Sequence, residues 1–234
     1  MNVRLLKSTP DPEKTIALAA KLCYSDSDIG GLEERLAGEE TGRFIEGIVA
    51  MGHHSVLEHA SFTFGIEGIS RATSHQLVRH RLASYSQQSQ RYVRAGGDAE
   101  YVTPDSIASR SDLKRRFDGA VTALYSLYGE LVDAGVPAED ARYLLPNAAC
   151  TKIIVTMNAR ELLHFFRLRC CERAQWEIRR MATAMLSLVK ELAPTVFADA
   201  GPACVRGPCS EGAMSCGRPD EIRRKFRSLG EDRP

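Results

Sequence analysis

Two kinds of hydrophobic repeat run along the chain. Residues 61–69 alternate apolar and polar positions, which is typical of a half-buried β-strand. Residues 2–7 alternate more loosely, and residues 151–157 are rich in β-branched side chains, so both are further strand candidates. Residues 112–132 carry apolar side chains at steps of three and four, which predicts a long helix with one apolar seam. The seam comprises Leu113, Phe117, Ala120, Leu124, Leu127 and Leu131, and we expect it to pack in the core.

Further helices are predicted where helical periodicity follows a capping or turn signal. Of the first two predicted helices, one starts near Pro12 and the other spans residues 32–51. The third starts at Arg71, after Ser70, and the fourth spans residues 138–145. The fifth starts after Asn158, and the sixth spans residues 174–192. In the helix after Asn158, Glu161 stands where the acid of a capping box belongs. After Ala200 the sequence has Gly, Pro and Cys but no periodicity. The pattern therefore predicts an α+β protein, with residues 1–200 as a single domain and residues 201–234 as a C-terminal tail.

Composition narrows the class of protein. The 234 residues are 44% hydrophobic and 26% charged, as in ordinary globular proteins, and no apolar run approaches the length of a membrane span. The first residues lack the pattern of a signal peptide, so we expect a cytoplasmic protein with no membrane partner. The formal net charge is only +1, which argues against a bulk nucleic-acid binder and favours a small partner.

Positive charge is nevertheless concentrated in one stretch. Residues 68–97 contain no Asp or Glu but five arginines. These are Arg71, Arg79, Arg81, Arg91 and Arg94. Serines and glutamines are interleaved with them. Guanidinium groups together with neutral hydrogen-bond donors suit an anionic ligand, whereas a solvated basic surface does not need the neutral groups. On a helix from Arg71, Gln76, Arg79 and His80 would share one face.

Metal binding is not expected. The seven cysteines are scattered, and the last three, Cys204, Cys209 and Cys216, lack the paired knuckles of structural zinc sites. Residues 53–59 contain three histidines and Glu58 without the spacing of a zinc protease, so polar or ligand contacts are the preferred reading.

Common phosphate-binding and nucleophile motifs are missing from the sequence. It contains no P-loop, no nucleophile elbow and no strand-linked G-x-G-x-x-G. No base stands beside Ser89 in a recognisable triad, so its hydroxyl is expected to bind rather than attack. The residues alone therefore indicate an α+β protein whose arginines and helix ends bind a phosphorylated small molecule.

One longer sequence pattern is more specific than the features described above. Residues 79–91 read R-H-R, seven residues, S, any residue, R, and in this the chain resembles the flavin-dependent thymidylate synthases. The same order of motifs continues in the segments at 53–59, 141–146, 158–160 and 168–177. The resemblance spans roughly residues 2–200 and leaves the tail outside.

The resemblance implies an antiparallel sheet flanked by long helices, in a homotetramer whose active sites combine several subunits. It implies synthesis of dTMP from dUMP, with methylenetetrahydrofolate as carbon donor, FAD as hydride carrier and NADPH as reductant. By position, FAD contacts are expected from Ser55, Arg79, His80, Arg81, Gln87, Asn158, Arg160 and His164. Contacts with dUMP are expected from Gln76, Arg79, Gln87, Gln88, Ser89, Gln90, Arg91, Arg142 and Arg169. Of these, Gln76, Arg79 and Arg142 would come from a neighbouring subunit.

Arg169 is the expected catalytic residue. A protonated guanidinium cannot act as a base, but it can stabilise negative charge that develops on the uracil ring. Two positions depart from the family pattern. Many members have a carboxylate where this chain has Gln87, so no acid–base role is assigned there, and position 164 is often Asn rather than His.

Two alternatives stay open from the sequence. One is another flavoenzyme or phosphate-ester enzyme on the same scaffold. The other is a non-catalytic nucleotide- or RNA-binding module, which the sequence disfavours because aromatic residues are not interleaved with the arginines as stacking platforms. Since every expected site residue precedes Ala200, removal of the tail is expected to leave flavin binding intact.

Overall fold

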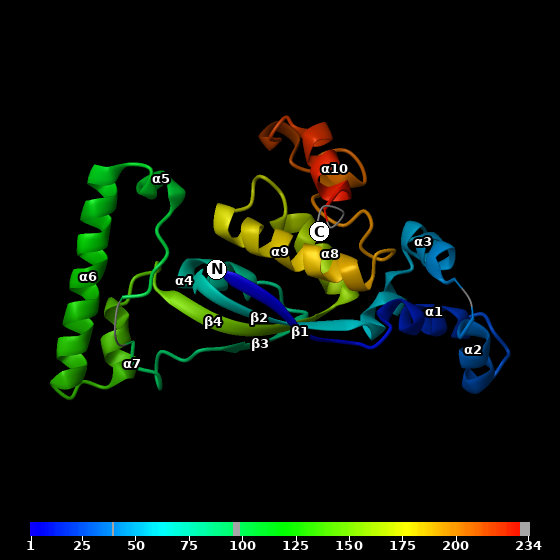
Figure 1. The fold of residues 1–234 in the computed structure, drawn as a ribbon, viewed down its shortest axis with the longest axis horizontal. Helices are drawn as coiled ribbons and strands as arrows, with labels where there is room; N and C mark the ends of the chain where they lie inside the picture. The colour runs from blue at the N-terminus through cyan, green and yellow to red at the C-terminus, as the bar shows by residue number, and fades with distance from the viewer. Residues whose placement is uncertain (39, 96–98, 230–234) are drawn as a thin grey trace. The chain divides into compact units, whose positions relative to one another are not determined.

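The computed structural model describes residues 1–38, 40–95 and 99–229. Its centre is a four-stranded antiparallel sheet with the order β1-β2-β4-β3 (Figure 1). The strands are β1 (Asn2–Ser8), β2 (Ser61–Ser70), β3 (Ala83–Gln87) and β4 (Cys150–Asn158). The predicted α+β class with an antiparallel sheet is confirmed, as are the three predicted strands. Strand β3 falls inside the arginine-rich stretch and was not predicted.

The helices follow most of the predicted segments. They are α1 (Pro12–Leu22), α2 (Ile29–Leu36), α3 (Gly42–Ala50), α4 (Arg71–Leu77), α5 (Asp105–Ala108), α6 (Ser111–Asp133), α7 (Ala138–Ala141), α8 (Ala159–Arg169), α9 (Trp176–Leu192) and α10 (Pro219–Arg227). Short 3₁₀ turns are η1 (His54–His59), η2 (Arg142–Leu144), η3 (Ala203–Val205) and η4 (Gly212–Met214). The single helix predicted over residues 32–51 is wrong, because α2 and α3 are separate helices there.

The chain divides into two compact units. Unit 1 comprises residues 1–2, 66–79 and 85–154, and unit 2 comprises residues 3–65, 80–84 and 155 onward. This division differs from the expected boundary after Ala200, which stays a prediction about independent folding.

Unit 1 is organised around the long helix α6. Its buried side chains are Val121 and Tyr128, and the Tyr128 hydroxyl accepts a hydrogen bond from the Ala95 amide at 3.1 Å. The predicted apolar seam is not fully packed within the chain, since Leu127 on it remains 43% exposed. The helix is therefore confirmed, but the expectation that its whole seam lies in the core is wrong for the single chain.

Unit 2 has an aromatic core beneath α8 and α9. Phe62 of β2 meets Phe197 edge to face at 5.7 Å between ring centroids, and Phe166 of α8 meets the same ring at 6.0 Å. Phe165 packs against Phe166 at 5.7 Å. Each of these rings is at most 1% exposed, so the even positions of β2 and one face of α8 meet in a dry core.

The tail folds onto unit 2. Helix α10 buries Ile222 and Phe226, and the ammonium of Lys190 on α9 donates to the Phe226 carbonyl at 2.6 Å. Gly201 has φ +147°, and a Cβ there would lie 3.0 Å from Phe226, so a side chain at this position would be strained and crowded. The tail thus has a helix and a buried face that its lack of apolar periodicity did not predict.

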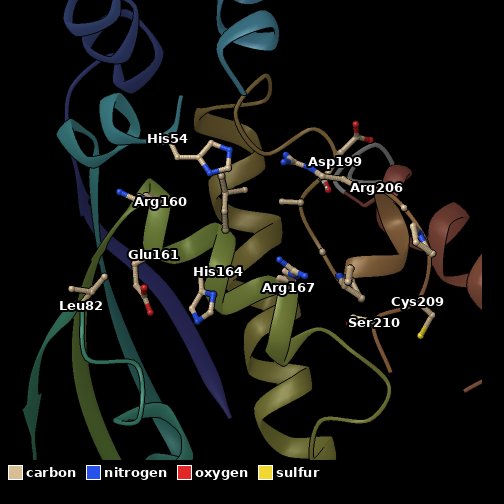
Figure 2. Close-up of a pocket in the computed structure, with 17 residues that line it drawn as sticks. His54, Leu82, Arg160, Glu161, His164, Arg167, Asp199, Arg206, Cys209 and Ser210 are labelled. Carbon is tan, nitrogen blue, oxygen red and sulfur yellow. Dashed lines mark hydrogen bonds between the residues drawn. The ribbon is translucent and has the colours of Figure 1, made fainter. Parts of the chain in front are cut away.

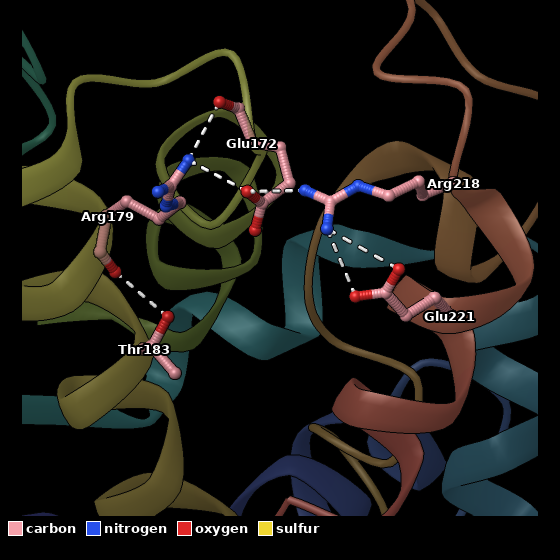
Figure 3. A network of polar contacts seen from close by, with 5 residues as sticks. All are labelled: Glu172, Arg179, Thr183, Arg218 and Glu221. Carbon is pink, nitrogen blue, oxygen red and sulfur yellow. Dashed lines mark hydrogen bonds and ion pairs between the residues drawn. The ribbon is translucent and has the colours of Figure 1, made fainter.

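Ion pairs also join the tail to the segment after α8. Arg218 pairs with Glu172 at 3.2 Å and with Glu221 at 3.2 Å, and Arg179 of α9 pairs with the same Glu172 at 3.1 Å (Figure 3). Glu172 is well shielded, with a side chain 17% exposed, so its pairs with Arg179 and Arg218 are screened less than open surface pairs, whereas the pair of Arg218 with Glu221 is exposed. Within unit 2 the network links the start of α10 to the segment after α8 and, through Glu172, to α9.

Candidate active site

The residues expected to form the site separate into two groups, one in each unit. Unit 1 contains Gln76, Arg79, Gln87, Gln88, Ser89, Gln90, Arg91 and Arg142. Unit 2 contains Ser55, His80, Arg81, Asn158, Arg160, His164 and Arg169. Every expected dUMP contact except Arg169 thus lies in unit 1, and most expected FAD contacts lie in unit 2.

One predicted cluster is not formed. Helix α4 ends at Leu77, so Arg79 and His80 lie beyond its end and do not share a helical face with Gln76. Gln76 instead folds back, and its amide donates to the Ala72 carbonyl at 3.4 Å. Arg79 is exposed whereas His80 is buried, and the two neighbours belong to different units. The one-faced arrangement is therefore wrong.

In unit 1 the chain after β3 is held by short polar contacts. The Gln87 amide donates to the Thr151 hydroxyl at 3.1 Å, and the Gln88 backbone amide donates to the Lys152 carbonyl at 2.9 Å. The Ser89 hydroxyl accepts from the Arg91 backbone amide at 3.1 Å. These bonds fix the backbone that presents Ser89 and Arg91.

Three arginines gather near α7 and η2. Arg91 pairs with the Glu139 carboxylate at 2.8 Å, and Arg142 donates to the Glu139 carbonyl at 3.0 Å. Burial and the charge of Arg142 both lower the pKa of Arg71, which remains protonated at working pH. Such mutual repulsion is relieved by an anion. Arg71 is a candidate that the sequence analysis did not select, although it lies in the acid-free stretch.

In unit 2 a chain of three polar side chains links α8 to the signature segment. His80 Nδ1 lies 3.1 Å from Glu161 Oε1, and Arg169 Nε donates to His80 Nε2 at 3.0 Å. His80 and Glu161 are each 5% exposed, and Phe165 packs edge to face on the imidazole at 4.9 Å. Glu161 and Arg169 stand at the two ends of the same helix, and His80 bridges them.

The partners determine the tautomer of His80. Arginine has only donors, so Nε2 must be the acceptor in the bond with Arg169. The single proton of the neutral ring then sits on Nδ1 and is donated to Glu161. Burial, together with the charges of Arg169 and His164, lowers the pKa of His80 to about 4, which agrees with a neutral ring. Burial also raises the pKa of Glu161.

The His80 pKa gives a prediction about stability. Because the usual pKa of 6.5 falls to about 4 on folding, the unfolded chain binds this proton more tightly. The contribution of His80 is therefore fully present above about pH 6.5 and is lost as the pH falls toward 4, by up to ~3 kcal/mol at 1.36 kcal/mol per pKa unit. Denaturant unfolding between pH 7 and pH 4 tests this. Glu161, whose pKa is raised, changes the unfolding free energy with pH in the opposite direction. His80→Gln is therefore the control that isolates the contribution of His80. If the unfolding free energy of this variant depends on pH as steeply as that of the wild type, the prediction is contradicted.

Asn158 behaves as a helix cap, as expected. Its side chain accepts from the Glu161 backbone amide at 2.9 Å. The Glu161 side chain points to His80 instead of completing a capping box, so that part of the expectation is replaced by a contact with a residue 81 positions away. Arg160 beside them pairs with Glu58 of η1.

Unit 2 also contains a cavity of about 860 Å³ (Figure 2). Figure 2 shows side chains of α8 on one side and those of the segment around residues 199–210 on the other. Its polar lining includes His54, Arg160, Glu161, His164, Arg167 and Arg206. Of the eight expected FAD contacts, Arg160 and His164 line this cavity. The other six are not among its lining residues: Ser55, Arg79, His80, Arg81, Gln87 and Asn158.

Comparison with known proteins decides the family. The family described as thymidylate synthase complementing protein matches residues 4–195. A flavin-dependent thymidylate synthase of Geobacter sulfurreducens is 60% identical over 98% of this chain and 99% of its own length. One of Clostridium tetani is 46% identical over 97% of both chains. The chain belongs to the flavin-dependent thymidylate synthases.

A solved structure supports the same assignment. The UMP/dUMP methylase PolB from Streptomyces cacaoi, bound with 5-Br dUMP, superposes with a TM-score of 0.73 at 25% identity. The match covers 84% of this chain and 92% of that chain. The enzyme is therefore a flavoprotein methyltransferase of dTMP biosynthesis, as the resemblance predicted. The family match ends at residue 195, which leaves the tail outside it, whereas the Geobacter relative also aligns over the tail.

The residues of the unit 2 cavity fit the flavin that this family requires. FAD combines an apolar ring system with a negatively charged diphosphate. The cavity offers guanidinium groups of Arg160, Arg167 and Arg206 for the charge and apolar walls from Leu82 and Leu163. Arg167 and Arg206 were not selected from the sequence, and only their basic character could have indicated them, whereas His54 lies in the segment 53–59 for which ligand contacts were expected.

His80, Glu161 and His164 also have the composition of a small metal site. One ligand atom from each lies within 4.8 Å of the others. However, both ring nitrogens of His80 already have partners, so a cation bound to the ring would have to displace either the Nδ1 proton shared with Glu161 or the guanidinium of Arg169. The absence of a metal requirement stays a prediction. No helix in the described part of the chain has both the length and the apolar character to cross a membrane.

Proposed function

We propose that the enzyme converts dUMP to dTMP with methylenetetrahydrofolate as the carbon donor and with FAD that is reduced by NADPH. The observation that carries the proposal is the division of residues 79–91 between the two units. His80 and Arg81 belong to unit 2, while Gln87 to Arg91 belong to unit 1. On this proposal the signature supplies residues to both the cofactor group and the substrate group.

For dUMP, the arginines near η2 supply the charge for the phosphate. Arg91 of one subunit and Arg142 of a neighbouring subunit have planar forks that suit phosphate oxygens bidentately, and Arg71, whose pKa the charge of Arg142 lowers, adds a third positive charge. Ser89, Gln88 and Gln90 supply uncharged donors and acceptors for the remaining polar atoms. If the substrate phosphate replaced the Glu139 carboxylate as the partner of Arg91, the guanidinium would bind the substrate.

For the uracil ring, Arg169 supplies positive charge. C5 of uracil becomes nucleophilic toward the methylene carbon as negative charge builds on N3 and its flanking oxygens, and a fixed guanidinium stabilises that charge more strongly than mobile water does. Bound reduced FAD would supply the hydride that completes the methyl group. Arg160 and His164 are proposed to bind the cofactor. The remaining contacts that the family resemblance implies are those of Ser55, Arg79, His80, Arg81, Gln87 and Asn158.

We further propose that the active enzyme is a homotetramer. The partly exposed seam of α6, with Leu127 at 43%, is an apolar surface that a second copy of the chain would cover. The resemblance assigns Gln76, Arg79 and Arg142 to the subunit next to the one that holds the substrate, so each site would need at least two copies of the chain.

Complementation tests the shared site. Arg79→Ala and Arg169→Ala should each be inactive, yet a mixture under subunit exchange should regain activity, because some hybrid sites contain both arginines. Turnover of the mixture against each variant alone is the measurement. Light scattering and a tagged subunit verify assembly and exchange. No recovery despite demonstrated exchange contradicts the shared site.

Ser89 is predicted to bind rather than to react. Its hydroxyl accepts from the Arg91 amide, and no His is hydrogen-bonded to it among the contacts of the described residues. Ser89→Ala should therefore raise the KM for dUMP by roughly tenfold, the scale of one lost hydrogen bond, and keep measurable turnover. Ser89→Thr, which retains the hydroxyl, is the matched control. A trapped covalent adduct between Ser89 and the nucleotide in the wild type would overturn the assignment.

The visible spectrum of the purified protein tests the cofactor most simply. We expect flavin bands after purification or after addition of FAD and gel filtration, and bleaching of those bands when NADPH is added without oxygen. Failure to retain any flavin in a folded protein would contradict the proposed cofactor, and retention without bleaching would contradict NADPH as reductant.

A further inference from the structure

We propose that Glu161 is a positioning residue which, through His80, holds the guanidinium of Arg169 in the orientation that the uracil ring requires. The inference rests on the proposed role of Arg169 and deepens it. It assigns a task to a buried acid that neither the signature nor the family motifs single out.

The first step is the placement of Glu161. It is the third residue of α8, and its backbone amide is already satisfied by the Asn158 cap. Its carboxylate does not return to the cap but lies 3.1 Å from His80 Nδ1, in a site where the residue is only 5% exposed. Burying a carboxylate costs free energy unless a hydrogen-bond donor compensates it. The carboxylate therefore favours the form of His80 that carries its proton on Nδ1 and donates it to Glu161.

The second step is the immobilisation of His80. One edge of the ring faces Glu161, the opposite nitrogen accepts from Arg169, and Phe165 packs on it at 4.9 Å. His164 also meets the ring, at 5.8 Å between centroids. With Nδ1 committed as donor to the carboxylate, Nε2 must present its lone pair to Arg169.

The third step is the effect on Arg169. The guanidinium is planar and rigid, so a hydrogen bond at Nε fixes the plane in which both Nη groups lie. Arg169 is the last residue of α8, where the helix itself restrains the backbone but not the end of a long side chain. The bond to the imidazole restrains that end of the side chain. If the proton of His80 moved to Nε2, two donors would face each other and the restraint would be lost.

The matched substitutions are Glu161→Leu and Glu161→Gln. Leucine is close in size but has no acceptor, so the Nδ1 proton loses its partner. Glutamine retains a carbonyl oxygen that can still accept from Nδ1. Glu13→Gln serves as the control for loss of a carboxylate in the same unit, since Glu13 accepts from the Thr195 and Val196 amides and has no recorded contact with His80.

The first measurement is the tautomer of His80 by ¹⁵N NMR of the full-length holoenzyme labelled at histidine, with His80→Gln to assign the signal. We expect the proton on Nδ1 in the wild type, in Glu161→Gln and in Glu13→Gln, and a shift toward Nε2 in Glu161→Leu. A wild-type ring that carries its proton on Nε2 overturns the proposal, and this result needs no variant to fold.

The second measurement is steady-state kinetics with dUMP. Because Glu161 also lines the cavity proposed for FAD, kcat is measured at saturating FAD. Glu161→Leu should then lower kcat by roughly 10–100-fold, the scale for loss of a group that orients another, with a smaller change in KM. Glu161→Gln should lose less, and Glu13→Gln should match the wild type. Wild-type kcat in Glu161→Leu, or an equal loss in both Glu161 variants, overturns the positioning role.

The two proposals fail in different ways. If the wild type itself makes no dTMP, the proposed function fails. If the wild type makes dTMP and Arg169→Lys lowers turnover while Glu161→Leu does not, the proposed function survives and only the role of Glu161 fails.

Discussion

Replacing Arg169 by lysine is expected to lower turnover by roughly 10²–10³, the usual effect of removing one transition-state donor, while FAD content and stability stay near those of the wild type. Lysine keeps a positive charge but loses the planar fork and the Nε–H that binds His80 at 3.0 Å. The single ammonium cannot bond His80 and face the ring in one fixed plane. Steady-state kcat, the flavin spectrum and a thermal melt of the same preparation are the measurements.

Arg167→Lys is the matched control for this experiment. Arg167 lies two positions earlier on α8 and is exposed, and it lines the cavity proposed for FAD without a recorded contact with His80. Its replacement should alter flavin affinity more than kcat at saturating FAD. Wild-type turnover in Arg169→Lys would refute the catalytic role, and loss of the fold would show that Arg169 is structural.

Removal of the chain after Ala200 is expected to abolish stable flavin binding and to destabilise unit 2, contrary to the expectation from the sequence alone. The segment from Gly201 to Ser210 lines the cavity proposed for FAD. Val205, Ile222 and Phe226 are at most 3% exposed, and burial of each such side chain contributes about 1.5–3 kcal/mol. Their joint loss approaches the entire stability of an ordinary domain, about 5–15 kcal/mol.

Two smaller changes separate stability from flavin binding. Truncation after Ser228 keeps α10 and should behave as the wild type. Phe226→Ala should cost about 3–5 kcal/mol of unfolding free energy while leaving the cavity residues in the chain. Flavin retention is measured by gel filtration and absorbance, and unfolding by denaturant. A folded protein ending at Ala200 that keeps its FAD would show that the tail is a separable appendage.

Local signals predicted the regular elements well. The alternation over residues 61–69 gave β2, and the three-and-four spacing after Asp112 gave α6. Helix α10 also had its signals, because Pro219 stands in the first turn with Asp220 and Glu221, and basic residues fill the last turn. With only two buried side chains four positions apart, it showed too little apolar periodicity to be recognised.

The site depended on information that local patterns do not contain. Glu161 matched a capping box locally, but a contact with His80 across 81 positions determined its side chain instead. The helix from Arg71 stopped at Leu77, and no helix breaker in the sequence marks that end. The assignment of Arg169 came from the family resemblance, and its bond to His80 emerged only from tertiary structure.

The most direct test of the account is product formation by the purified, full-length enzyme. dUMP, methylenetetrahydrofolate and NADPH are incubated with the protein, with and without added FAD after the bound flavin has been stripped, and the nucleotides are separated by chromatography. We predict dTMP in an amount equal to the dUMP consumed, with formation dependent on FAD and nearly lost in Arg169→Lys. Oxidation of NADPH without dTMP, or dTMP formation that needs no flavin, would contradict the account.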